Sequence, residues 1–95
     1  MKIFYIHGWG STFSPESEKI QTLMELGTVR GPNLDYPAGF RGVMGQCRAM
    51  LMDDDYDVII GTSLGGYTAS HLAPTAGLPF VAINPAVDPP HSLGK

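Results

Sequence analysis

The sequence between residues 58 and 66 constrains the fold of this chain more strongly than any other stretch. A short apolar run at residues 58–60 leads into a Gly-x-Ser-x-Gly signature centred on Ser63, and a segment capable of forming a helix follows. This order predicts a strand, a tight turn and a helix, with the serine presented at the turn. Gly61 and Gly65 fit that turn because side chains there would collide with the neighbouring strand and helix. We therefore expect an α/β fold in which Ser63 is a candidate nucleophile.

A second glycine motif closes an apolar run near the N-terminus. Residues 3–6 are rich in strand formers, and His7-Gly8-Trp9-Gly10 follows them. In a parallel sheet, the crevice that carries the active site lies at the carboxyl ends of the strands, which is where both glycine motifs fall. The two motifs are thus predicted to meet at one end of the sheet.

Serine chemistry at such a site has two requirements. The hydroxyl needs a base to take its proton, and the tetrahedral intermediate needs hydrogen-bond donors for its oxyanion. We expect the backbone N–H of Leu64 to be one donor and the loop at Gly8 and Trp9 to supply a second. The predicted role of His7 is to shape this loop through hydrogen bonds. The amino end of the helix after Ser63 also favours developing negative charge.

The base, and the acid that orients it, are harder to assign. His71 lies eight residues past Ser63, about 12 Å along a helix axis at 1.5 Å per residue, and we expect it to be a partly buried helix residue rather than the base. His91 follows the last predicted strand and Asp88 precedes it, which fits the chain order serine, acid, histidine. Two prolines separate them, so the pair would be difficult to orient together. His91 and Asp88 are the candidate base and acid.

Strands and helices are predicted to alternate along the chain. We expect four strands, at residues 3–6, 33–36, 58–60 and 78–83. We expect three helices, one capped by Ser14 and ended by Gly27, one at residues 41–52 and one at residues 64–73 that Pro74 stops. Thr28-Val29-Arg30 is the alternative for the second strand. This order predicts one domain over residues 1–95, with a parallel β-sheet of about four strands and helices on both faces.

Composition excludes several classes of partner. The 95 residues include six scattered Lys and Arg and carry a formal net charge of −3, which argues against nucleic acid. No apolar stretch reaches the length of a membrane span. Cys47 is the only cysteine, so no internal disulfide forms, and we expect a cytoplasmic location. Asp53-Asp54-Asp55 is expected to be a solvated turn, and neither a metal nor a cofactor is predicted.

Three segments resemble the small α/β-hydrolase esterases of the YqiA/YcfP type. They are residues 3–8, residues 61–67 and residues 77–87, and the resemblance extends over about residues 2–94. It implies a truncated α/β-hydrolase fold, Ser63 as nucleophile, and small or acyl esters as substrates. Members of that family carry their catalytic acid and base on loops beyond the point where this sequence stops. The resemblance therefore implies the N-terminal half of such a fold, either a fragment or a naturally short member.

Two functions from different classes follow from this. The first is a serine esterase, complete in a longer parent or with residues from a partner. The second is a catalytically incomplete module that binds a partner protein. The strand at Phe80–Ile83 would form an exposed apolar edge, which natural proteins avoid. We expect a second copy, the missing half or a partner protein to cover it.

Two further interpretations stay open. The glycine motif after residues 3–6 is placed as a dinucleotide-binding fingerprint would be, with Asp35 positioned for a ribose. Against this, Phe13 replaces the third glycine, and residues 61–66 lack the lysine of a phosphate loop. The second interpretation is that Ser63 only caps the helix that follows it.

Overall fold

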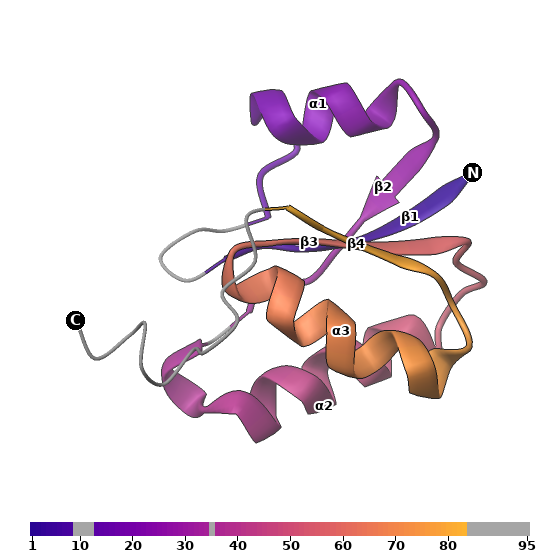
Figure 1. The fold of residues 1–95 in the computed structure, drawn as a ribbon. Helices are drawn as coiled ribbons and strands as arrows, with labels where there is room; N and C mark the ends of the chain where they lie inside the picture. The colour runs from indigo at the N-terminus through magenta and orange to yellow at the C-terminus, as the bar shows by residue number, and fades with distance from the viewer. Residues whose placement is uncertain (9–12, 35, 84–95) are drawn as a thin grey trace.

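A computed structural model describes residues 1–8, 13–34 and 36–83 of the chain (Figure 1). Its strands are β1 (Lys2–Ile6), β2 (Thr28–Arg30), β3 (Val58–Thr62) and β4 (Phe80–Ile83). Its helices are α1 (Glu18–Met24), α2 (Phe40–Leu51) and α3 (Leu64–Ala76), with a short 3₁₀ turn, η1 (Tyr36–Ala38), before α2. The strands are parallel and lie in the order β2-β1-β3-β4. This architecture confirms the predicted α/β class.

Helices cover both faces of the sheet, as the alternation predicted. Figure 1 shows α1 on one face and α2 and α3 on the other. Successive strand residues point to opposite faces. The core toward α2 and α3 therefore contains Phe4, Ile6 and Ile59, while the core toward α1 contains Ile3, Tyr5, Val29 and Ile60. Burial on both faces explains why the first strand reads as a continuous apolar run.

The second strand is Thr28–Arg30, so the prediction of a strand at residues 33–36 was wrong. Val29 is its one buried residue, and it pairs with Ile3 of β1. Residues 28–30 come soon after the short helix α1 and pair with β1, which leaves Leu34 and Tyr36 beyond the end of this pairing. Gly31 comes directly after β2, where its backbone lies close to that of β1. A Cβ on Gly31 would lie 2.1 Å from the carbonyl oxygen of Tyr5.

Two helix boundaries also differ from the predictions. α1 begins after Ser17 and not at Ser14, because the Ser17 hydroxyl caps it by accepting a hydrogen bond from the Ile20 N–H at 3.2 Å. α3 continues through Pro74, since a proline in the last turn removes only one helical hydrogen bond. Gly77 ends that helix in the left-handed conformation, with a φ of 69°.

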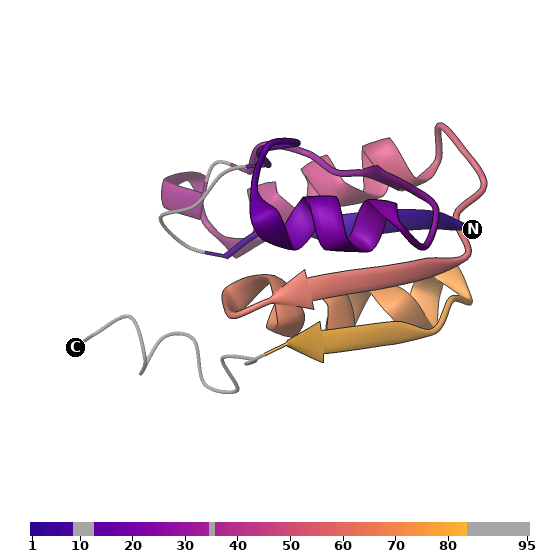
Figure 2. The ribbon, with the colours of Figure 1, turned by 90° about the horizontal axis from the view of Figure 1, so that it is seen from above.

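Strand β4 lies at one edge of the sheet, where the sequence predicted an open strand. β3 is its one neighbour in the strand order of the described residues. Phe80 is 42% exposed and Val81 is 49% exposed. Figure 2 shows that α1 does not extend over β3 and β4 on its face of the sheet. That a second copy, the missing half or a partner protein covers this edge stays a prediction.

Candidate active site

Ser63 occupies the turn between β3 and α3 in a strained backbone conformation. Its φ is 52° and its ψ is −121°, and among the described residues it is the one non-glycine with a positive φ. These angles belong to the first central position of a type II′ turn, which glycine normally fills, and they cost another residue on the order of 1–3 kcal/mol. Ser63 is exposed, and its hydroxyl makes no capping hydrogen bond to α3. The geometry therefore favours a nucleophile turn over a helix cap.

Gly61 and Gly65 allow the turn to be this tight. A Cβ on Gly61 would lie 2.1 Å from the carbonyl oxygen of Gly65. A Cβ on Gly65 would lie 2.1 Å from the carbonyl oxygen of Ile6. Both distances are impossible for a real side chain, so α3 packs backbone to backbone against β3 and β1. This packing fixes the amino end of α3 directly behind Ser63.

The loop after β1 reaches the nucleophile turn at Gly8. β1 and β3 pair with Ile6 opposite Gly61, so the residues that follow each strand lie side by side. A Cβ on Gly8 would lie 3.0 Å from the Cβ of Ser63 and 3.6 Å from its Oγ. The two glycine motifs are therefore adjacent in space. Trp9, the other predicted donor of this loop, lies outside the described residues.

The other expected oxyanion donor, the backbone N–H of Leu64, lies at the amino end of α3. Leu64 is the first residue of α3, and the N–H groups of a first helical turn have no acceptor within their own helix. The Ser63 carbonyl accepts the N–H of Gly66 at 3.0 Å, which closes the turn. The partial positive charge at a helix N-terminus adds to the stabilisation of an anion there.

His7 is 1% exposed, and backbone groups engage both of its ring nitrogens. The Leu34 N–H donates to Nε2 at 2.8 Å, so Nε2 carries no proton. Nδ1 then carries the ring proton and donates it to the Gly8 carbonyl at 2.8 Å. This arrangement supports a loop-shaping role for His7 and leaves neither nitrogen available as a base for Ser63.

Tyr36 is a second support of the same loop, and sequence reasoning missed it. Its hydroxyl donates to the His7 carbonyl, and its ring meets the imidazole edge-on with centroids 5.5 Å apart. The hydroxyl also hydrogen-bonds with Thr68 of α3. Burial raises the pKa of Tyr36 far above its usual value, so the hydroxyl keeps its proton. No spacing rule connects a tyrosine with a carbonyl 29 positions earlier.

The base and the acid are not among the residues that the structure describes. His91 and Asp88 both lie in residues 84–95, which are outside the described ranges. Within those ranges, no side chain hydrogen-bonds to the Oγ of Ser63. The proposed pair therefore stays a prediction from chain order.

His71 is exposed and not partly buried as expected. α3 turns Thr68 and Leu72 toward the core, which places His71 on the outer side of the helix. There its ring contacts Tyr67 and Phe40, with centroids 4.5 Å and 5.6 Å away. The side chain belongs to a surface aromatic cluster about two helical turns from Ser63.

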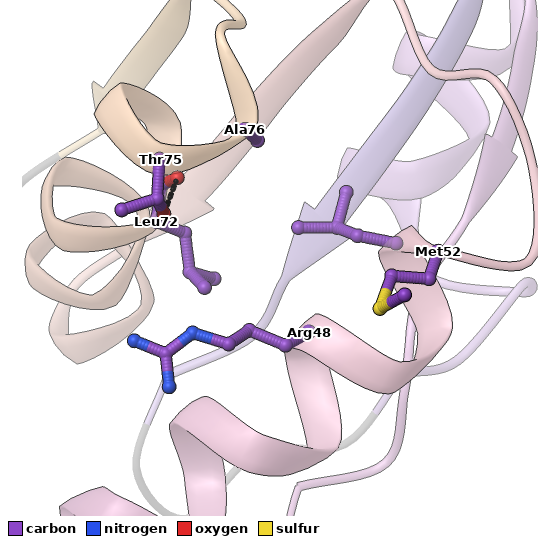
Figure 3. A pocket seen from close by; sticks show the side chains of 6 residues that line it. Arg48, Met52, Leu72, Thr75 and Ala76 are labelled. Carbon is purple, nitrogen blue, oxygen red and sulfur yellow. Dashed lines mark hydrogen bonds between the residues drawn. The ribbon is translucent and has the colours of Figure 1, made fainter.

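A cavity of about 210 Å³ lies between α2 and α3, away from the candidate site. Figure 3 shows Arg48 of α2 and Met52, which follows that helix, facing Leu72 and Thr75 of α3 across it. These residues lie toward the carboxyl ends of the two helices, which lead into the amino ends of β3 and β4. Ser63 lies at the carboxyl end of β3, so the cavity is at the opposite end of the sheet.

In the acidic turn after α2, Asp54 forms ion pairs with Lys2 and Arg30. Asp54 accepts hydrogen bonds from the Lys2 ammonium at 2.8 Å, and Arg30 lies 3.4 Å away. The hydrogen bonds from Lys2 and from the Asp55 N–H hold the pKa of Asp54 below its usual value. Over residues 1–8, 13–34 and 36–83, no three His, Cys, Asp or Glu side chains gather as a metal site would require. None of the helices in these ranges has the length and apolar character to cross a bilayer.

Comparison with known proteins identifies the relatives of this chain. It is 33% identical over 102 residues to a UPF0227 protein of Shewanella woodyi. The match covers 98% of this chain and 56% of the relative, so the chain spans about half the length of the curated relative. The description of the family names no activity. Because the family model matches residues 2–95, the chain belongs to the uncharacterised protein family UPF0227.

Proposed function

We propose that this chain carries the nucleophile of a serine hydrolase that acts on small or acyl esters. The observation that carries the proposal is the backbone of Ser63, held at a φ of 52° between a parallel strand and a helix. A serine that only packs or caps gains nothing from this strain. A nucleophile gains an exposed hydroxyl at the end of the sheet, next to backbone donors.

In the proposed reaction, the Oγ of Ser63 attacks the ester carbonyl carbon while a base takes the hydroxyl proton. The carbonyl oxygen becomes an oxyanion, which the Leu64 N–H and the loop at Gly8 stabilise. The intermediate then collapses, the base gives its proton to the leaving alcohol, and the acyl group stays on Ser63. Water, deprotonated by the same base, attacks the acyl group, releases the acid and restores the serine.

The proposal assigns three further roles, which chain order or family resemblance supports. His91 is the proposed base, Asp88 the acid that orients it, and Trp9 a second donor of the oxyanion loop. Residues supplied by the remaining length of a longer relative are the alternative source of base and acid, since the match covers 56% of that relative.

Hydrolysis of p-nitrophenyl acetate and p-nitrophenyl butyrate tests the proposal. Ser63→Ala is expected to lower turnover to the buffer rate with an unchanged melting temperature. Ser70→Ala is the matched control, because Ser70 lies on the same helix and its hydroxyl only donates to the Tyr67 carbonyl at 2.6 Å. Turnover that survives in Ser63→Ala would rule out Ser63 as the nucleophile.

The second candidate function is a binding module without its own turnover. The observation that favours it is the open edge at β4, where Phe80 and Val81 are exposed apolar residues on a strand that has one neighbour in the described sheet. A second copy of the chain or another protein would add a strand there. Val81→Lys is then expected to convert an oligomer to monomer in light scattering. An oligomeric state that does not respond to this charge argues against the edge as interface.

A further inference from the structure

We propose that Tyr36 is a positioning residue, whose hydroxyl sets the loop at His7 and Gly8 against the helix that carries Ser63. This inference rests on the proposed hydrolase function, and it adds a residue to that site. Tyr36 comes from η1, which lies outside both glycine motifs.

One hydroxyl bridges the two halves of the site. The Tyr36 hydroxyl donates to the main-chain carbonyl of His7, at the start of the oxyanion loop. The same group hydrogen-bonds with Thr68, one turn into α3 from the nucleophile turn. Because Tyr36 gives its one hydroxyl proton to His7, it accepts this second hydrogen bond from the Thr68 hydroxyl. Hydrogen bonds therefore join Thr68 of α3 to the His7 carbonyl through Tyr36.

The segment before α2 holds the loop at more than one point. The Leu34 N–H donates to Nε2 of His7 at 2.8 Å, and the Tyr36 ring packs edge-on against the same imidazole. With His7 fixed, its Nδ1–H holds the Gly8 carbonyl. Hydrogen bonds thereby fix the His7 carbonyl, the Gly8 carbonyl and the His7 ring. Oxyanion donors act only when such supports fix them before the reaction.

The ring of Tyr36 and its hydroxyl have separate roles, the first in core packing and the second in positioning. Tyr36 is 8% exposed and belongs to the core cluster with Met44 and Cys47, so its ring contributes to packing in any case. Phenylalanine preserves that ring and removes only the hydroxyl. Tyr56 provides the matched control, because it is buried in the same cluster and contacts Phe4 edge-on with centroids 5.1 Å apart, but it lies before the amino end of β3.

The test compares Tyr36→Phe with Tyr56→Phe in the full chain, by ester kinetics and by amide hydrogen exchange at Gly8. A displacement on the scale of an ångström lowers the rate by up to about 10²-fold, so Tyr36→Phe is expected to lower kcat by at least about 10-fold with KM unchanged. It is also expected to speed exchange of the Gly8 amide, whereas Tyr56→Phe changes neither quantity. Thr68→Val should reproduce the loss of kcat and Thr68→Ser should restore it, which keeps the test decisive if Tyr36→Phe does not fold.

The outcomes distinguish this inference from the hydrolase proposal. If the wild type has no turnover, the hydrolase proposal fails, and exchange at Gly8 alone decides whether Tyr36 holds the loop. If the wild type turns over and a folded Tyr36→Phe keeps its kcat, the positioning role is overturned while the nucleophile stands. Equal Gly8 exchange in the Tyr36→Phe and Tyr56→Phe variants also overturns it.

Discussion

The hydroxyl of Tyr36 donates a hydrogen bond to the carbonyl of His7, 29 positions earlier in the chain. This contact joins the segment between β2 and α2 to the loop after β1. In place of a strand, Leu34 and Tyr36 of this segment both hydrogen-bond to His7. The candidate site thus depends on three separate parts of the sequence: the loop after β1, the turn before α3, and the segment that supports His7.

Gly65→Ala is expected to destabilise the fold by about 1–3 kcal/mol, because the added Cβ would meet the Ile6 carbonyl oxygen at 2.1 Å. Gly45→Ala is the matched control. Gly45 lies inside α2 with nothing within 4 Å of an added Cβ, so alanine there should stabilise by about 1 kcal/mol through its higher helix propensity. Urea unfolding of both variants measures the difference. Shifts of the same sign would contradict the backbone packing described for α3.

Ser63→Gly is expected to be more stable than Ser63→Ala by about 1 kcal/mol. Both variants lack the hydroxyl, so the comparison isolates the backbone. Glycine relieves about 1–3 kcal/mol of strain at a φ of 52° and loses about 0.4–1 kcal/mol through the freedom of its unfolded chain. Thermal melting of the two variants gives the measurement. An alanine variant as stable as the glycine variant would show that Ser63 is not strained.

Cys47 is expected to resist thiol reagents in the folded protein. It is fully buried, and burial raises its pKa to about 12, which leaves about one thiolate in 10⁴ molecules at pH 8. Labelling with iodoacetamide, followed by intact mass, should give no adduct in native buffer and one adduct in 6 M guanidinium. Rapid native labelling would show that α2 opens or packs differently.

The ion pair at Asp54 is expected to make stability depend on acid pH. Its folded pKa is lowered by Lys2, so the carboxylate stabilises the fold above its unfolded pKa of about 3.9, and this contribution is lost as the pH falls through the folded value. The melting temperature of the wild type should exceed that of Asp54→Asn at pH 7, and the gap should close toward pH 2. A gap that is constant from pH 7 to pH 2 would contradict the ion pair.

Local patterns predicted β1, β3 and β4 and the tight turn at Ser63. The strands at residues 3–6 and 58–60 are buried on both faces of the sheet, which explains their apolar sequences. The turn contains glycines because its backbone segments pack closely. Such apolar runs and glycine turns can be recognised in the sequence because residues close together in the chain determine them.

Contacts between residues far apart in the chain determine the features that the sequence did not predict. Thr28–Arg30 buries only Val29, so its pattern is weaker than that of residues 33–36, yet pairing with β1 selects it. Tyr36 supports His7 because the fold brings η1 beside the loop after β1. No pattern in the sequence near Tyr36 indicates this contact. Pro74 reads as a helix stop, but the packing of α3 on the sheet outweighs one lost hydrogen bond.

The measurement that tests the central claim most directly is intact-mass spectrometry after treatment with a fluorophosphonate, followed by peptide mapping. We expect a single adduct on Ser63 of the wild type and none on Ser63→Ala, because the reagent bonds covalently only to an activated serine. A folded wild-type protein that forms no adduct would contradict the account of Ser63 as an activated nucleophile in this chain. So would an adduct that persists in Ser63→Ala.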